Sequence, residues 1–447
     1  MTENNILIKR ISRQSGDTQP DLSISPVIRE SSLLVQQYRT RAWDKYQSIK
    51  IPDNSQEDWK RTSLRAVDFS SFELIDPSGY LYRGFPVYFD SPVAGTKNGG
   101  MILLSPVENK VTVSTALTEK GVVFDTLANV VKTQPHLIEK LLSRIDIDKL
   151  PKFSALAGAI DFQGVLLYVP RNVDIDLPLQ SVYWAPGEGY SHSLHIFVYL
   201  EEGSNVTYVH ESSSPQKAIK DSMHTAMIDV YVGAGAHLNF VELQSWGENI
   251  INFTTENVQV DLDGSVDWIF GALGSKITKN YSNLSMVGKG ASGKMSGFYF
   301  TDNSQHLDHD TQQNHLAPST TSDLLFKGAL LDNSRSVWQG MIYVAPDAAK
   351  TDGYQANRNL VLSKSARADS IPGLEILTDD VRCTHGAIVG KIDEEQVFYL
   401  LSRGMQREDA ERLIVEGFFD PIMQRIPFEG VRQRFQSAIK EKMEHIR

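Results

Sequence analysis

The most chemically distinctive stretch of this 447-residue chain is Arg382-Cys383-Thr384-His385-Gly386, near the C-terminus. It holds the single cysteine of the chain, and a histidine follows two positions later. If this segment is an extended strand, residues i and i+2 project to the same side. The Cys383 sulfur and the His385 imidazole could then address one atom together. A thiolate and an imidazole suit soft or borderline metals such as iron and zinc.

This pair alone cannot form a closed metal site. Structural zinc takes about four protein ligands, and an iron–sulfur cluster is usually held by about four cysteines. A chain with one cysteine cannot supply them. Two alternatives remain open. Either the pair is structural, since a lone cysteine commonly acts as a small buried apolar residue, or a second protein completes the site.

A second stretch, residues 302–315, is dense in side chains that bind cations or transfer protons. It contains Asp302, His306, Asp308, His309, Asp310 and His315. In a strand, His306, Asp308 and Asp310 would share one face, with His309 on the other. These residues are candidates for a divalent-metal site. They could equally form the polar outer face of a strand.

Two common catalytic motifs are absent from the sequence. Residues 290–294 (GASGK) lack the spacing of a phosphate-binding glycine loop and the Ser or Thr that follows its lysine. No Gly-x-Ser-x-Gly nucleophile elbow occurs. We therefore do not expect this chain to hydrolyse nucleotides.

The middle of the chain, residues 161–372, predicts a parallel β-helix. Short runs of β-branched and aromatic residues alternate there with Gly, Asn and Asp. VYLEEGSNVTYVHE from Val198 and VYVGAGAHLNFVEL from Val230 are near copies, with corners at Gly203 and Gly235, and VQVDLDGSVDWIFG from Val258 is a weaker copy with its corner at Gly264. Repeated strand–corner–strand units suggest a solenoid or an antiparallel sandwich, and the scarcity of hairpin signals favours the solenoid.

Helical units are expected on both sides of this core, because the ends of a solenoid present unpaired backbone and need cover or a partner. Residues 1–160 read as a mostly helical N-terminal unit, including one helix over residues 125–143. Residues 373–447 form a helical C-terminal unit, whose second helix is expected to end before Pro421. The last helix carries Val431, Phe435, Ile439 and Met443 on a narrow stripe, which is a packing face or a docking face.

Composition narrows the function classes. The net charge is −11 and no Lys/Arg cluster offsets it, so a role in nucleic-acid binding is not expected. No segment approaches the roughly 18 apolar residues of a membrane span, and the polar N-terminus lacks the apolar core of a signal peptide. One cysteine excludes a disulfide framework and fits a reducing compartment, the cytoplasm or an organelle stroma.

Four stretches carry a resemblance to a known family. Residues 368–419 (ADSIPGLEILTDDVRCTHGAIVGKIDEEQVFYLLSRGMQREDAERLIVEGFF) are similar to the C-terminal signature of SufD, in the SufB/SufD family of the SUF iron–sulfur cluster assembly system. The string SDLLFKGALLDNSRSVWQGMIYVAPDAAKTDGYQANRNLVLS from Ser322 resembles the end of that family's β-helix, GVLLYVPRNVDIDLP from Gly164 its entry, and EDWKRTSL from Glu57 its N-terminal element. Cys-Thr-His-Gly-Ala is of the SufD type.

The resemblance implies a non-ATPase scaffold subunit with a β-helix core flanked by helices. It implies a heterodimer with SufB, and two copies of the ATPase SufC in the complex, with SufC docked on the C-terminal helices. The candidate docking residues are Val397, Leu401, Leu413 and Phe418. A nascent iron–sulfur cluster would form at the SufB–SufD interface, where Cys383 and His385 occupy the family's ligand positions and the histidine is the better supported.

The resemblance also implies properties that cannot be assigned to particular residues. Reduced flavin is associated with such complexes, and a homodimer is an option when the partners are absent. The compartment would be the cytoplasm, or the plastid stroma in a plant or alga. The competing reading is a polysaccharide-acting β-helix enzyme whose acid/base or metal site is the stretch from Asp302 to His315. A third is a structural scaffold without ligands of its own.

Overall fold

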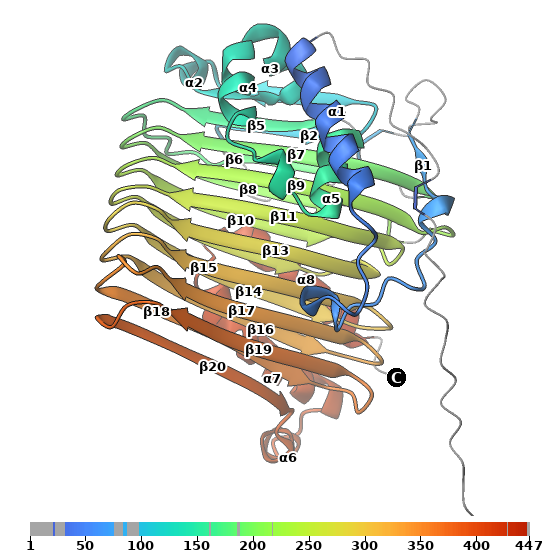
Figure 1. Cartoon of the computed structure of the whole chain (residues 1–447). Helices are drawn as coiled ribbons and strands as arrows, with labels where there is room; N and C mark the ends of the chain where they lie inside the picture. Colours follow the sequence, from blue (N-terminus) through green and yellow to red (C-terminus); the bar gives the residue numbers. More distant parts are fainter. Residues whose placement is uncertain are drawn as a thin grey trace, which may run out of the picture.

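The computed structural model describes residues 21–22, 32–75, 84–86, 98–160, 162–185, 188–216, 218–426 and 428–444. At its centre the chain winds through two sheets in turn, so each coil adds one strand to each sheet (Figure 1). The parallel strands of the first sheet are β5 (Gly164–Val169), β7 (Tyr190–Leu200), β9 (Ser222–Val232), β11 (Ile250–Val260), β13 (Ile277–Met286), β15 (His306–His315), β17 (Arg335–Val344) and β19 (Arg367–Ile376). Those of the second are β6 (Leu179–Trp184), β8 (Asn205–Ser213), β10 (His237–Ser245), β12 (Ser265–Ala272), β14 (Ser292–Thr301), β16 (Thr321–Leu330), β18 (Thr351–Val361) and β20 (Val381–Lys391). The predicted mainly β fold with a parallel β-helix is confirmed.

The sequence copies stack in register, as expected for a solenoid. Val230 pairs with both Val198 and Val258. Leu238 likewise lies between its equivalents in the preceding and following coils. One detail of the prediction is wrong: the left-handed corner of the third copy is Asp263, at φ 50°, not Gly264. Aspartate tolerates this conformation because its short polar side chain hydrogen-bonds locally.

The interior between the two sheets is filled by apolar side chains from successive coils. They include Leu194, Val206, Phe240, Trp268 and Tyr299, all almost fully buried. A strand's side chains alternate between this interior and the outer face of its sheet. Each outer face therefore needs its own cover, and the two helical units provide it.

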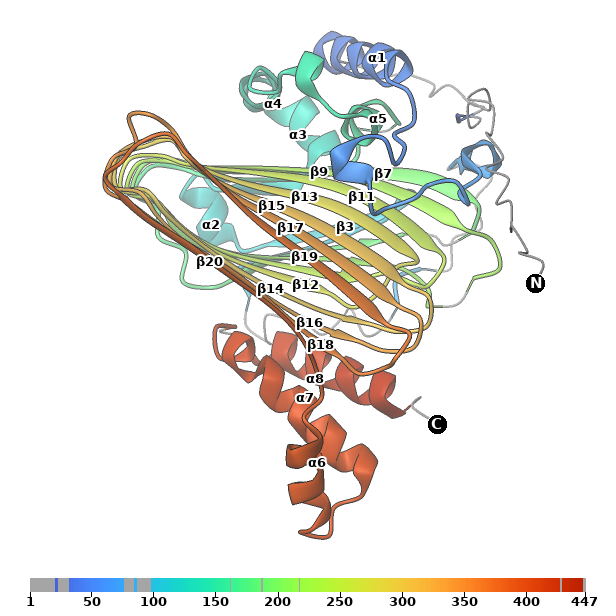
Figure 2. The same ribbon diagram turned by 60° about the horizontal axis from the view of Figure 1, so that its bottom comes forward.

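The N-terminal helices are α1 (Leu33–Ser48), α2 (Thr115–Glu119), α3 (Leu127–Thr133), α4 (Pro135–Leu142) and α5 (Lys152–Ile160), with short 3-10 turns η1 (Glu57–Trp59), η2 (Phe69–Ser71) and η4 (Ile147–Lys149). Four of them, α1, α3, α4 and α5, lie on the outer face of the first sheet, whereas α2 covers the end of the interior between the two sheets, where Leu117 is buried (Figure 2). The single helix predicted over residues 125–143 is two helices, because Gln134 precedes Pro135 and leaves helical geometry at φ −143° and ψ 59°.

The N-terminal unit also contributes strands that close the first coil. β4 (Val123–Thr126) runs antiparallel to β5, while β2 (Gly100–Leu104) pairs with β6 and with β3 (Asn109–Val113). A short strand, β1 (Glu73–Leu74), pairs with β7. This end of the solenoid is therefore capped by antiparallel strands as well as helices.

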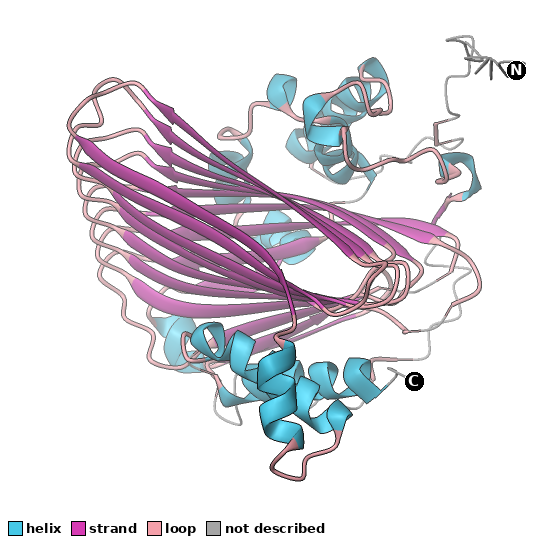
Figure 3. Ribbon diagram, turned by 90° about the horizontal axis from the view of Figure 1, so that it is seen from below, coloured by secondary structure: helices cyan, strands magenta, loops and turns pink. Residues whose placement is uncertain are grey.

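The C-terminal helices are α6 (Glu394–Leu401), α7 (Arg407–Met423) and α8 (Glu429–Glu444). α7 and α8 pack on the outer face of the second sheet, opposite the N-terminal helices (Figure 3). They bury Val431, Phe435, Ile439 and Met443, so that stripe is a packing face. α7 continues through Pro421 to Met423, whereas the sequence predicted an end before the proline.

The solenoid extends further along the chain than the sequence indicated. The predicted boundary at 372/373 lies inside β19, and β20 continues the core to Lys391. The last coil, β19 and β20, is not covered by α7 and α8, because those helices lie against the side of the solenoid. No helix among the described residues is long and apolar enough to cross a membrane.

Candidate functional site

Cys383 and His385 lie on β20, the terminal strand of its sheet, which pairs with β18 alone among the described strands. The register places Cys383 beside Gly353 and His385 beside Gln355. Gly353 and Gln355 are buried and belong to the inward row of β18. By the same alternation, Cys383 and His385 share the inward side of β20. The extended geometry that the sequence argument required is therefore present.

The two side chains are reachable because no further coil lies beyond β20 in the described chain. His385 is exposed and Cys383 is half-buried. Cys383 packs at the margin of a small cluster of Ile342, Val344 and Ala348. An inward-facing pair at an open end can meet a ligand that enters from another molecule.

Gly353 holds space open beside the cysteine. A Cβ atom at this position would lie 3.3 Å from Cys383 Sγ and 3.3 Å from His315 Nε2. His315 is fully buried, and its two ring nitrogens lie 2.8 Å from Thr320 Oγ1 and 2.9 Å from Ser322 Oγ. His315 is therefore a fixed neighbour of the thiol whose nitrogens already have partners.

The electrostatic surroundings keep the cysteine protonated. Partial burial raises the pKa of the Cys383 thiol, and the Asp352 carboxylate acts in the same direction, while a hydrogen bond from the Gly353 backbone opposes them. A neutral thiol is a poor nucleophile and a poor ligand. Coordination of a metal would itself displace this proton, since a coordinating thiol is deprotonated.

A set of apolar side chains surrounds the pair at this open end, which we call the end face. The end face comprises Leu374, Ile376 and Leu377 at the end of β19, and Ile388 and Val389 on β20, each between 36% and 59% exposed. The free edges of β19 and β20 present unpaired backbone groups beside them. Apolar side chains next to free strand edges mark a surface suited to another protein.

The second candidate group, within residues 302–315, does not have the free ligands that a metal site needs. His306, Asp308 and Asp310 do share one face of β15, as predicted, but that face is covered. Lys279 Nζ lies 3.1 Å from Asp308 Oδ2 and 2.7 Å from Asp310 Oδ2. Thr62 Oγ1 lies 2.7 Å from His306 Nε2 and also bonds Asp308. The lysine ammonium takes the place of a metal cation.

The remaining residues of that stretch do not join it. Asp302 pairs with Lys442 of α8 at 2.5 Å, on the other side of the molecule. His309 and His315 face the interior, and burial lowers the pKa of His309 to about 3. The stretch is therefore not one acid/base site, and the polysaccharide-enzyme reading fails on geometry. No group of three or more His, Cys, Asp or Glu within the described ranges is arranged to hold a metal.

The four predicted docking residues of the C-terminal helices differ in exposure. Val397 is fully buried, so it packs the α6–α7 hairpin and cannot contact a partner. Leu401 and Phe418 are half-buried, and Phe418 lies against Lys327 at 4.6 Å. Leu413 is 46% exposed, so it is the most accessible of the four.

A groove lies beside Leu413, between α6 and α7, with a volume of about 450 Å³. Its lining includes Tyr399, Leu400 and Ile414 as well as Leu413. Phe398 and Tyr399 are among the most exposed large apolar residues of the molecule. The sequence argument missed these two aromatics because it considered the apolar residues that pack on the inner side of this helix. Phe398 and Tyr399 lie on its outer side. Their signal was a Phe-Tyr pair in a short helix that has no room to bury both faces.

Comparison with known proteins agrees with this architecture. The family described as "SUF system FeS cluster assembly, SufBD core domain" matches residues 183–418, and "SufBD protein N-terminal region" matches residues 24–181. An iron–sulfur cluster assembly SufBD family protein of Staphylococcus saprophyticus is 31% identical over 316 residues, 70% of this chain and 67% of the relative. Proteins of the same description from Staphylococcus epidermidis and Staphylococcus aureus are 30% identical over the same coverage.

The core match includes the end face, Cys383, His385 and the α6–α7 groove, and the two matches together cover most of the described structure. The chain belongs to the SufBD family of SUF-system iron–sulfur cluster assembly proteins.

Proposed function

We propose that this chain is the SufD-type scaffold subunit of a SUF assembly complex, and that it completes a nascent-cluster site jointly with a SufB-type paralogue. The observation that carries the proposal is the position of Cys383 and His385. They are neighbouring inward-facing residues on the last, uncovered strand of the solenoid. Iron and sulfide are the cargo assembled there, and the chain acts as a scaffold without an enzymatic activity of its own.

The end face supplies the means of pairing. A β-helix partner that aligns its own terminal coil with β19 and β20 would continue both sheets across the interface. The inward-facing residues of the end face, such as Val389, would then be buried between the two solenoid interiors, whereas Ile388 lies on the outer side of β20. In the absence of that paralogue, a second copy of this chain would occupy the same surface and form a homodimer.

The number of available ligands supports this arrangement. Cys383 and His385 provide one sulfur and one nitrogen, and the described chain offers no third ligand beside them. The paralogue must therefore supply the rest. Of the two, His385 is the exposed one and lies nearer to an incoming partner, while the Cys383 thiol must lose its proton on binding.

The SufC-type ATPase would bind at the groove between α6 and α7, with Tyr399, Leu413 and Phe398 as the exposed contacts. Only Ile392 and the N-cap residue Asp393 separate β20 from α6. Movement of α6, driven by association of two ATPase copies, would therefore pull directly on the strand that carries Cys383 and His385. This coupling would open the cluster site when ATP is bound.

The function of the ligand pair is tested by replacing His385 with Ala and reconstituting the complex with its paralogue, the ATPase, iron and sulfide. We expect cluster loading to fall severalfold. Thr384→Ala is the matched control, because Thr384 is exposed on the opposite side of the same strand. Normal loading in the His385→Ala complex would reject the ligand role. Normal loading also in a Cys383→Ser, His385→Ala double variant would favour a scaffold without ligands.

A further inference from the structure

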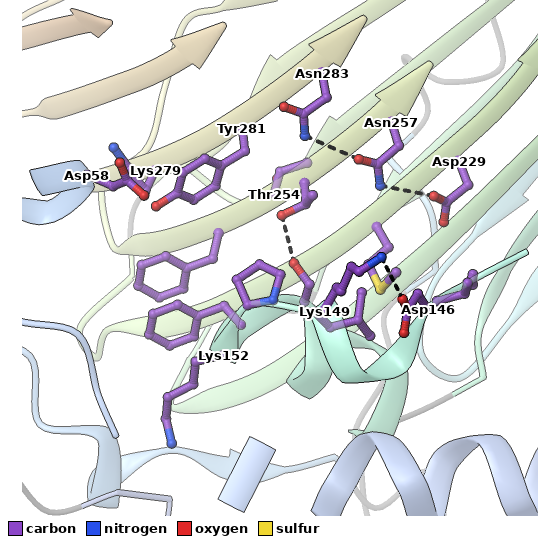
Figure 4. A pocket seen from close by; sticks show the side chains of 18 of the residues that line it. Asp58, Asp146, Lys149, Lys152, Asp229, Thr254, Asn257, Lys279, Tyr281 and Asn283 are labelled. Carbon is purple, nitrogen blue, oxygen red and sulfur yellow. Dashed lines mark hydrogen bonds and ion pairs between the residues drawn. The ribbon is translucent and has the colours of Figure 1, made fainter. Parts of the chain in front are cut away.

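The polar side chains inside the solenoid are bonded less completely than those on its outer face. On the outer face of the first sheet, Asn283 donates to Asn257 at 3.2 Å and Asn257 donates to Asp229 at 3.1 Å, so neighbouring coils satisfy one another (Figure 4). In the interior, several fully buried polar atoms form no hydrogen bond with any described residue. Such atoms are costly to leave without a partner, and in native proteins they bind ordered water.

Three of these interior residues lie in register on consecutive strands of the first sheet. They are Asn280 on β13, His309 on β15 and Trp338 on β17, each no more than 1% exposed. Within the described chain, the unbonded atoms are Asn280 Oδ1, both ring nitrogens of His309, and Trp338 Nε1. Neighbouring strands are about 4.8 Å apart, and two hydrogen bonds of about 2.8 Å to one water molecule join atoms at that separation. The column therefore has the spacing of a file of water molecules.

The protonation state of His309 suits a position within such a file. Burial lowers the pKa of His309 to about 3, so the ring is neutral at pH 7. The rings of Phe270, Tyr299 and Phe326 surround it with centroids 5.2–6.1 Å away, and they leave both of its nitrogens without a hydrogen bond among the described residues. A neutral imidazole has one donor and one acceptor nitrogen. It can therefore accept a proton from one water molecule and donate a proton to the next.

The inner end of the column meets a pair of buried carboxyl groups. Asn280 donates to Glu256 Oε1 at 3.0 Å, and Glu242 approaches Glu256 from the second sheet. Burial raises the pKa of Glu256 to about 7 and also raises the pKa of Glu242, so the pair holds a proton at neutral pH. A cavity of about 10 Å³ beside Glu242 is lined also by His210 and His224, whose pKa values burial lowers. This cavity has room for about one water molecule.

The outer end of the column reaches the end face beside His385. The step from Trp338 to the second sheet passes Gly340, where a Cβ atom would overlap both the Trp338 ring and Gln355 Oε1. Gln355 Oε1 is buried and accepts no hydrogen bond in the part of the chain that the structure describes. Gln355 is in register with His385 on β20, the uncovered terminal strand. Unbonded polar atoms therefore continue coil by coil from the carboxyl pair to the open end.

We propose that a file of ordered water molecules runs through the solenoid interior along Asn280, His309 and Trp338, and that it exchanges protons between the Glu242–Glu256 pair and the open end at Gln355. The file lies within one chain, so it requires neither a partner subunit nor the ligand role of Cys383 and His385. Its mouth is at the end face, so a partner that covers the end face would also cover this route.

The test is infrared spectroscopy of the isolated full-length chain after a rapid change from H2O to D2O at about pH 6, below the pKa of about 7 of Glu256. The C=O band of the protonated pair is the band lost in Glu256→Gln, and it shifts when a deuteron replaces the carboxyl proton. We expect this shift within the mixing time in the unchanged protein. His309→Leu and Gln355→Met interrupt the file with apolar side chains of similar size. Exchange then requires local opening of the fold and should be at least about tenfold slower.

Gln312→Met is the matched control, because Gln312 lies on the outer side of the strand that carries His309 and bonds Asn314 at 2.9 Å. Circular dichroism confirms folding of each variant, and either of the two interior variants is sufficient for the test. The proposal is overturned if the unchanged protein exchanges as slowly as the interior variants, if neither of them slows exchange, or if Gln312→Met slows it equally.

Discussion

Val389→Asp tests whether the end face is buried against a paralogous partner. Val389 is paired with Asn359 and lies in the inward row of β20, where 47% of its surface is exposed. Full burial of a valine side chain stabilises by about 2 kcal/mol, so a partner that covers the exposed half gains about 1 kcal/mol from it. This is the contribution lost on any polar replacement.

The aspartate adds a larger cost in the complex than in the free chain. Enclosed between two apolar interiors, its carboxyl must be protonated, and at pH 7 protonation of a group with a pKa near 3.9 costs about 4 kcal/mol. The two contributions sum to about 5 kcal/mol as an upper limit, and a weakening of at least a hundredfold is expected. In the isolated chain the carboxylate remains in water, so stability should fall by only about 1 kcal/mol.

The assay is titration calorimetry of the purified chain against a SufB-type paralogue, with urea unfolding of each variant alone. Ile219→Asp is the control, because Ile219 is 93% exposed in a loop outside both sheets. An unchanged affinity for the paralogue in Val389→Asp would refute the argument that the terminal coil is the contact surface. A large loss of stability in the isolated variant would show that Val389 serves the chain's own core.

Three further outcomes follow from the packing and electrostatics. Phe435→Ala should lower the free energy of unfolding by about 3–5 kcal/mol in urea titrations, because this buried ring lies 4.2 Å from Phe298; a loss under about 1 kcal/mol would contradict the packing of α8. Burial raises the pKa of Glu256 to about 7 and also raises the pKa of Glu242, so the folded state holds extra protons and stability should fall as pH rises from about 4.5 to 7; Glu242→Gln should flatten this dependence in urea midpoints measured across that range, and an equally steep curve would contradict it. Leu413→Asp should weaken binding of the SufC-type ATPase about tenfold in pull-down titrations with little effect on thermal stability, whereas unchanged binding would remove the α6–α7 groove as its site.

The β-helix could be predicted because its information is local and repeated. Each coil carries its own alternation and corner, so the copies from Val198, Val230 and Val258 reveal the stacking without any long-range contact. The third corner moved to Asp263 because several residue types tolerate a left-handed conformation, and a glycine next to the position is not proof that it is used.

The contacts between distant segments could not be predicted. Asp308 and Asp310 were predicted as metal ligands because their partner, Lys279, lies in the previous coil and is distant in the sequence. Its ion pairs with the two aspartates depend on the stacking of the coils. The apolar stripe of α8 left open whether Phe435 packs within the chain or meets a partner, and it did not indicate that α8 lies on the side of the second sheet and leaves the last coil uncovered. Val397 and Leu413 were both predicted to contact a partner, but their different exposure depends on how α6 packs against α7, which the sequence does not indicate.

The most direct measurement of the central claim uses the single cysteine of the chain. Alkylation of Cys383 by iodoacetamide can be followed by mass spectrometry in the free chain and in its complex with a SufB-type paralogue. If the paralogue covers the end face and shares the ligand site, alkylation should be at least about tenfold slower in the complex. Equal rates in the free and bound chain would contradict the claim.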